Sequence, residues 1–230
     1  MAKKIRMGFI GAGAMGYSHL QLFHEQCKRQ AIAVALCASN RERIRKAQKI
    51  SPDIKLYKKE SELIQSDIDA VVISSPNFTH VPLALNCLKA GKHVFLEKPV
   101  GITVKECRQL LKATQKSDKV LMIGHELRYS PYFTRIKKLI NQGAVGTPIM
   151  TWCKEFRGPF QPKSRDWIQD RRKSGGCLVD KNCHHFDLMN WWMESRPKRV
   201  SAFGSNAVNR VISGPNQVHD HASASWEYAN

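Results

Sequence analysis

Short apolar runs alternate with segments of helical periodicity over the first half of the chain. Apolar runs predict buried strands at residues 5–10, 31–38, 70–74, 93–96 and 120–124, and a shorter one at 55–57. Helical periodicity predicts helices after Gly16, to about residue 26, and at residues 41–49, 79–90 and 103–116. Strands that alternate with helices in this way predict a doubly wound parallel sheet.

Three of these helix ends carry recognisable boundary residues. Thr79 has the side chain of an N-cap, and Gly91 follows the same helix at the position where a left-handed residue ends it. Thr103 and Glu106 have the spacing of a capping box. We therefore expect Thr79 and Thr103 to cap their helices.

The pattern changes after Gly124. A helix is predicted at residues 131–142 and ends at Gly143, and a second helix carries Asp180. Strand-like segments occupy residues 148–156, 199–206 and 222–228, and a polar, basic loop spans 158–176. The change predicts two domains, residues 1–123 and 124–230, the second with a mainly antiparallel sheet.

Charge and cysteine content narrow the classes of partner. The 230 residues include 37 Lys and Arg against 19 Asp and Glu, a formal charge of +18. The excess is +11 in residues 1–123 and +7 in 124–230, without an aromatic-basic stripe, which argues against a nucleic-acid partner. No apolar run reaches the roughly 20 residues of a membrane span, and we expect no signal peptide and no membrane partner. Seven cysteines without framework spacing predict reduced thiols and a cytoplasmic location.

A glycine-rich turn follows the first predicted strand and precedes a helix. Gly11 permits the tight turn, Gly13 lets the backbone approach a pyrophosphate, and Gly16 lets the helix pack on the sheet. The free N–H groups of the helix N-terminus then attract the anion. The predicted cofactor-binding turn comprises Gly11, Ala12, Gly13, Ala14, Met15 and Gly16.

The residues after the second strand bear on the choice of cofactor. NAD-selective turns usually have an Asp or Glu there, to hold the ribose hydroxyls. This chain has Ser39, Asn40, Arg41 and Arg43 near that position, and no acid at the strand end. Cations and donors suit a 2′-phosphate, so we expect NADP in preference to NAD. The alternative is that both arginines are simply exposed on the following helix.

Asp180, His184 and Asp187 are spaced for one face of a helix. Gly175 and Gly176 precede this helix, whose apolar positions fit it for packing. A carboxylate and an imidazole on one polar face are suited to proton transfer. The cysteines and histidines in this segment match no standard zinc spacing, so we expect no metal site.

Glu97, Lys98 and Pro99 follow directly on the strand at residues 93–96. Ligands bind beyond the carboxyl ends of such strands, where Lys98 is well placed for chemistry. Together with the glycine turn, residues 74–80 and 90–94, and the Asp180 helix, these residues resemble the glucose–fructose oxidoreductase / inositol dehydrogenase / rhizopine-catabolism (Gfo/Idh/MocA) family. The resemblance covers essentially the whole chain.

The resemblance implies a Rossmann domain and an NAD(P)-dependent oxidoreductase acting on a hydroxyl or carbonyl carbon of a sugar, polyol or related ring. Lys98 would hydrogen-bond the reacting oxygen, His184 would be the general acid/base, and Asp180 would orient the substrate. Further residues would lie along the cofactor or beside its nicotinamide: Ser74, Pro76, Asn77, His80 and Glu97.

Members of this family usually exceed 320 residues, so the α+β domain of this chain is expected to be incomplete. A second hypothesis follows: a truncated cofactor-binding protein without turnover. The resemblance also implies a possible homo-oligomer through the sheet of the second domain.

Overall fold

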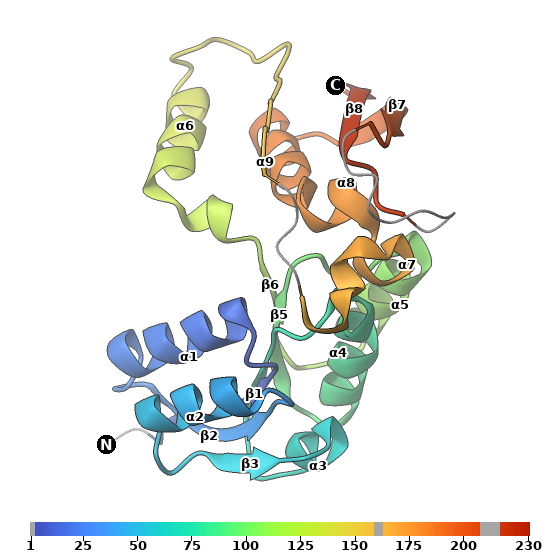
Figure 1. Ribbon diagram of the computed structural model, residues 1–230. Coiled ribbons are helices and arrows are strands. Elements are labelled where there is room, and N and C mark those ends of the chain that lie inside the picture. The colour runs from blue at the N-terminus through green and yellow to red at the C-terminus, as the bar shows by residue number, and fades with distance from the viewer. Residues whose placement is uncertain (1–2, 159–162, 208–216) are drawn as a thin grey trace. The chain divides into compact units, whose positions relative to one another are not determined.

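The computed structural model describes residues 3–158, 163–207 and 217–230 (Figure 1). The chain divides into two compact units, Met1–Gly124 and His125–Asn230. The boundary predicted from the sequence lies one residue before this division.

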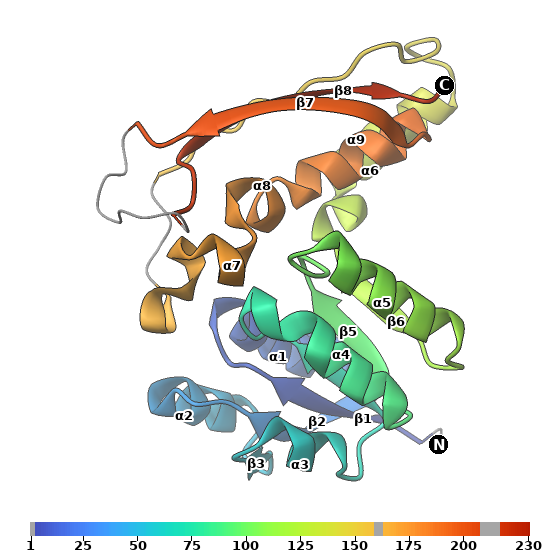
Figure 2. The ribbon, with the colours of Figure 1, turned by 90° about the vertical axis from the view of Figure 1, so that its right-hand side faces the viewer.

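The first unit is built on a six-stranded parallel sheet, with helices on both faces (Figure 2). The strand order is β3-β2-β1-β4-β5-β6, so the order reverses between β1 and β4. The strands are β1 (Ile5–Ile10), β2 (Ala31–Cys37), β3 (Lys55–Tyr57), β4 (Ala70–Ile73), β5 (His93–Glu97) and β6 (Leu121–Gly124). The helices are α1 (Ala14–Gln26), α2 (Arg41–Ile50), α3 (Glu60–Ile64), the 3₁₀ turn η1 (Asn77–Thr79), α4 (His80–Lys89) and α5 (Val104–Gln115).

Alternate residues of the strands supply two apolar layers. Met7 and Phe9 of β1 pack on one face with Leu20 of α1, while Ile10 packs on the other face with Leu110 of α5. All four residues of β4 are buried, as expected for a central parallel strand covered on both sides. Burial on both faces explains why the strands were recognisable as continuous apolar runs. The short helix α3 was not predicted from the sequence.

The three predicted helix boundaries have different outcomes. Thr103 and Glu106 form both hydrogen bonds of the capping box, and Gly91 follows α4 with φ of +71°. The predicted Thr79 cap is wrong. Thr79 Oγ1 donates to Pro76 O at 2.7 Å and contacts Ser75 Oγ at 2.6 Å. Since η1 leads directly into α4, Thr79 already has helical dihedral angles, and its hydroxyl turns back to the preceding loop.

The second unit combines helices with a two-stranded antiparallel sheet. Its helical elements are η2 (Glu126–Tyr129), α6 (Pro131–Asn141), η3 (Ser164–Gln169), α7 (Arg171–Ser174), α8 (Gly176–Asp180) and α9 (Cys183–Met193). The strands β7 (Pro197–Ser205) and β8 (His221–Tyr228) form the sheet. The predicted fold class, a doubly wound parallel sheet followed by an α+β unit with an antiparallel sheet, is confirmed.

Two predictions for this unit are wrong. Residues 148–156 form no strand, because none of the described residues pairs with them in a ladder. The predicted loop at 158–176 becomes helical from Ser164 onward, while its residues 159–162 lie outside the described part of the chain. Across the described ranges, no helix combines the length and apolar character needed to cross a membrane.

Candidate active site

The glycine turn joins β1 to α1 at the carboxyl edge of the parallel sheet. Gly11 has φ of +94°, and a Cβ there would lie 2.7 Å from Ser74 O. A Cβ on Gly16 would lie 2.3 Å from Gly11 O, so this glycine allows the helix to approach the turn. A Cβ on Gly13 would meet no protein atom within 4 Å. Gly13 therefore leaves open space directly at the N-terminus of α1.

This open space is what a pyrophosphate requires. Gly13 is the N-cap of α1 and provides no side-chain cap, so the first N–H groups of the helix remain available to an anion. The absence of a side chain lets a phosphate approach the backbone. The turn thus fits a dinucleotide, whose pyrophosphate the backbone between Gly11 and Gly16 would hold.

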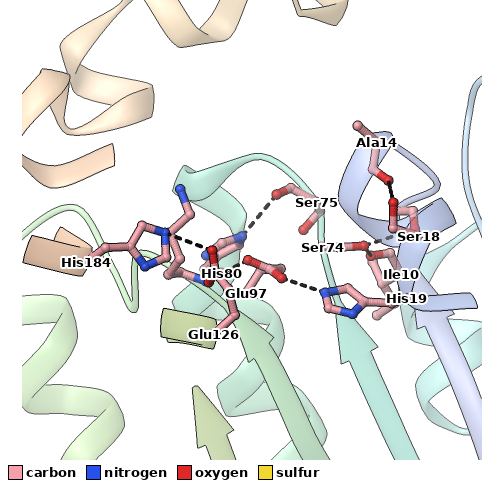
Figure 3. A network of polar contacts seen from close by, with 12 residues as sticks. Ile10, Ala14, Ser18, His19, Ser74, Ser75, His80, Glu97, Glu126 and His184 are labelled. Carbon is pink, nitrogen blue, oxygen red and sulfur yellow. Dashed lines mark hydrogen bonds and ion pairs between the residues drawn. The ribbon is translucent and has the colours of Figure 1, made fainter. Parts of the chain in front are cut away.

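The loop after the neighbouring strand β4 contacts the glycine turn through hydrogen bonds. Ser74 Oγ lies 3.1 Å from Gly11 O and 3.3 Å from Ile10 O (Figure 3). Pro76 leads into η1, and Asn77 is buried at the start of that turn. Ser74 thus lies beside the glycine turn, and Pro76 and Asn77 follow it in the loop after β4, a strand at the reversal point of the strand order where dinucleotides bind.

His80 is a correction to the predicted cofactor contacts. Its side chain is 1% exposed, with Nδ1 2.7 Å from Pro99 O and Nε2 3.0 Å from Ser75 O (Figure 3). Burial lowers the pKa of His80, while the two carbonyl oxygens act in the opposite direction. A ring enclosed between two backbone carbonyls has no surface for a cofactor. His80 instead ties the loop after β4 to the segment after β5.

Ser39, Asn40 and Arg41 follow β2 and are exposed at the start of α2. Asn40 is the N-cap, and its Oδ1 accepts a hydrogen bond from Arg43 N at 3.0 Å. Glu42 of the same helix pairs with Lys46 one helical turn further on. The end of β2 therefore presents a hydroxyl, an amide and a guanidinium.

Glu97 and Lys98 end β5 at the same edge of the sheet. Glu97 is 5% exposed, and its Oε2 accepts a hydrogen bond from Lys98 N at 3.2 Å. Its Oε1 lies 2.5 Å from Nε2 of His19 on α1. Gly124, the β6 partner of Glu97, leaves room for this carboxylate, since a Cβ there would lie 3.3 Å from Oε1. Neither the His19 contact nor the role of Gly124 was predicted from the sequence.

Asp180 and His184 belong to two helices rather than one. Both Lys181 N and Asn182 N donate to Cys177 O, which ends α8, and Phe186 N donates to Asn182 O as α9 begins. The predicted continuous helix with Asp180, His184 and Asp187 on one face is therefore wrong. Asp180 is 4% exposed at the end of α8, with Lys181 Nζ 3.1 Å from its Oδ2.

His184 lies on the first turn of α9 among polar and aromatic neighbours. Its Nε2 is 3.5 Å from Oε1 of Glu126 (Figure 3). The ring of His125 meets it edge to face, with 5.7 Å between the centroids. An imidazole beside a carboxylate can hold and release a proton.

Asp187 makes an ion pair that stabilises the second unit. Arg128 donates Nε to Oδ2 at 2.6 Å and a terminal nitrogen to Oδ1 at 2.8 Å. This two-point contact raises the pKa of Arg128, and the guanidinium also lies over the ring of Trp191. Arg128 and Asp187 thus join η2 to α9, which the sequence pattern did not indicate.

The strand order, the reversal point and the open glycine turn define a class: the first unit is a dinucleotide-binding Rossmann domain. Residues 5–125 match the family described as "Oxidoreductase family, NAD-binding Rossmann fold". Residues 133–230 match the "GFO/IDH/MocA C-terminal domain". The chain therefore belongs to the Gfo/Idh/MocA oxidoreductase family.

Individual relatives and solved structures are similar to most of this chain. Myo-inositol 2-dehydrogenase of Thermotoga maritima is 32% identical over 209 residues, which is 90% of this chain and 60% of the relative. A probable dehydrogenase structure from Thermotoga maritima has a TM-score of 0.78 at 29% identity, covering 98% of this chain and 66% of that one. A scyllo-inositol dehydrogenase structure from Lactobacillus casei, solved with NAD(H) and scyllo-inositol, has a TM-score of 0.80 at 23% identity, covering 99% and 67%; this match shows the fold alone. The chain spans about 60% of the length of the curated relatives it matches.

Proposed function

We propose that the chain acts as an NAD(P)-dependent oxidoreductase that transfers a hydride between the nicotinamide and a CH–OH or C=O carbon of a polyol or sugar. Family membership and the inositol dehydrogenase relative support this activity. The observation that carries it is the placement of an open pyrophosphate turn at Gly13 and of Lys98 at the same edge of one sheet. Cofactor and lysine would thus meet at the carboxyl ends of β1 and β5.

The cofactor would supply the hydride chemistry, and the protein would supply binding and orientation. The turn from Gly11 to Gly16 would hold the pyrophosphate, and Ser74, Pro76 and Asn77 would line the path toward Lys98. The Lys98 ammonium would donate a hydrogen bond to the reacting oxygen and stabilise negative charge on it.

Proton transfer would involve residues of the second unit. His184 would take the hydroxyl proton during oxidation or return it during reduction, and Asp180 would orient the substrate. The Glu126 carboxylate beside His184 supports this role, because it stabilises a protonated ring. Lys98 belongs to the first unit, whereas Asp180 and His184 belong to the second. Their joint action on one substrate is therefore a prediction.

A comparison of Lys98→Met with the unchanged chain tests the activity. Myo-inositol is the first substrate to assay, followed by a panel of polyols and sugars, each with NADP and with NAD. We expect oxidation by the unchanged chain and loss of the rate in Lys98→Met, with cofactor binding retained. A surviving rate would remove Lys98 from the mechanism. Cofactor binding without turnover on any substrate would favour the alternative, a cofactor-binding protein.

NADP is the cofactor that we propose to be preferred. The exposed Ser39 and Arg41, with no carboxylate at the end of β2, support it. Loss of a charge-assisted hydrogen bond from Arg41 should weaken NADPH binding by about 10- to 100-fold and leave NADH binding nearly unchanged. Fluorescence titration of Arg41→Ala, with Arg45→Ala of the same helix as the control, measures this. Equal effects on both cofactors would contradict the preference.

The proposed assembly is a homo-oligomer formed through the β7–β8 sheet. Val200 and Phe203 of β7 are 72% and 75% exposed, so this strand presents apolar side chains that an interface could cover. Sedimentation of the chain tests this, and a monomer at all concentrations would contradict it. A cytoplasmic location stays a prediction, supported by the cysteines: all seven lie in the described part of the chain, and no disulfide joins them.

A further inference from the structure

His19 connects the cofactor-binding helix to the segment that carries Lys98. It lies on α1, which begins at the glycine turn, and its Nε2 is 2.5 Å from Glu97 Oε1 (Figure 3). The ring also packs edge-on against Phe95 of β5, with 5.0 Å between the centroids. Two contacts with one strand fix the orientation of the imidazole.

The Glu97 carboxylate occupies a space that the sheet provides for it. Gly124 pairs with Glu97 across β5 and β6, and its missing side chain leaves the volume beside Oε1 open. The other oxygen, Oε2, accepts the N–H of Lys98. His19 thus holds one carboxylate oxygen while the second holds the backbone of the lysine.

A buried carboxylate is costly unless donors satisfy it. If the donor on His19 were lost, Glu97 would gain by turning its carboxylate toward water. That rotation would withdraw Oε2 from Lys98 N. The backbone N–H of Lys98 is therefore linked to His19 through a single intermediate side chain.

We propose that His19 is a positioning residue for Lys98, acting through Glu97. The contact couples α1, whose N-terminus receives the pyrophosphate, to the lysine at the end of β5. Its kinetic consequence rests on the proposed hydride transfer, whereas its structural consequence does not. Both can be measured separately.

The structural test is amide hydrogen exchange at Lys98, measured by NMR on this chain without cofactor. His19→Phe keeps an aromatic ring against Phe95 but removes the donor, and His19→Gln keeps a donor in place of Nε2. We expect exchange at Lys98 to accelerate by about 3- to 10-fold in His19→Phe and to remain near the original rate in His19→Gln. His24→Phe and His24→Gln, at an exposed position of the same helix, are the controls.

The kinetic test uses the same variants. His19→Phe should lower kcat by about 10-fold or more through misplacement of Lys98, with little change in cofactor affinity, and His19→Gln should restore most of the rate. Unchanged Lys98 exchange in His19→Phe, equal effects of both substitutions, or faster exchange with kcat unchanged would each overturn the proposal. If exchange responds as expected but the unchanged chain oxidises no polyol, the positioning contact stands and the proposed hydride transfer fails.

Discussion

Three glycines of one turn perform different tasks, which agree with those that the motif predicts for them. Gly11 adopts a left-handed conformation, and Gly16 faces Gly11 O and Ser74 Oγ at distances that no Cβ could accept. Gly13 faces no protein atom. Two of the glycines therefore serve the fold, and one leaves space for a ligand.

A Gly→Ala substitution should affect stability at one of these positions and NADPH binding at another. Gly16→Ala should lower the free energy of unfolding by about 1–3 kcal/mol, because the added methyl group overlaps a backbone oxygen. Gly13→Ala should leave stability nearly unchanged and weaken NADPH binding by about 10-fold or more, since the methyl group occupies the phosphate space. Urea unfolding and fluorescence titration measure the two quantities. A stable Gly16→Ala, or a Gly13→Ala that binds NADPH normally, would contradict the assignment.

Two threonines show that the backbone conformation before a helix decides whether a threonine caps it. Thr103 precedes α5 in extended conformation, so its hydroxyl reaches the amide of Glu106. Thr79 precedes α4 within a 3₁₀ turn, so its hydroxyl bonds Pro76 O instead. The residue type is the same, and the backbone before the helix decides the partner.

Loss of the capping box should be measurable in α5. Thr103→Ala should lower the free energy of unfolding by about 1 kcal/mol, because the N–H of Glu106 in the first turn loses its acceptor. Thr103→Ser keeps a hydroxyl and should retain most of the stability. Thermal unfolding of the two variants provides the comparison. Equal losses in both would show that the methyl group, rather than the cap, supports the helix.

At the scale of the whole molecule, the two units should respond differently to the cofactor. Cys37 and Cys87 are buried in the first unit, where burial raises their thiol pKa values to about 11 and about 12. Both should react with an alkylating agent only when this unit opens. Cys153, in the second unit, is exposed.

NADPH should therefore protect the buried thiols selectively. At 100 times its Kd, a ligand that binds only the folded unit slows opening-dependent labelling by about 100-fold. Mass spectrometry of iodoacetamide-treated protein should show this at Cys37 and Cys87, with Cys153 labelled at an unchanged rate. Protection of Cys153 to the same degree would contradict a selective effect on the first unit, and no protection of Cys37 and Cys87 would contradict cofactor binding to that unit.

The amino-acid sequence by itself determined the parallel sheet, the glycine turn, the capping box at Thr103 and the family. The strands, the turn and the cap each depend on residues close together in the chain, and the family resemblance combines several such segments. Both faces of the central strands are buried, so their apolar runs were unambiguous.

Only the tertiary structure decided which distant side chains meet. His19 and Glu97 are 78 positions apart, and their contact follows from the strand order and from the space left by Gly124. The enclosure of His80 between two carbonyls follows from the packing of α4 against the segment after β5. The break between α8 and α9 depends on hydrogen bonds to Cys177 O, whereas a helical spacing pattern continues through such a break. Local periodicity records which face of an element is apolar, but it carries no information about the partner on the other side of that face.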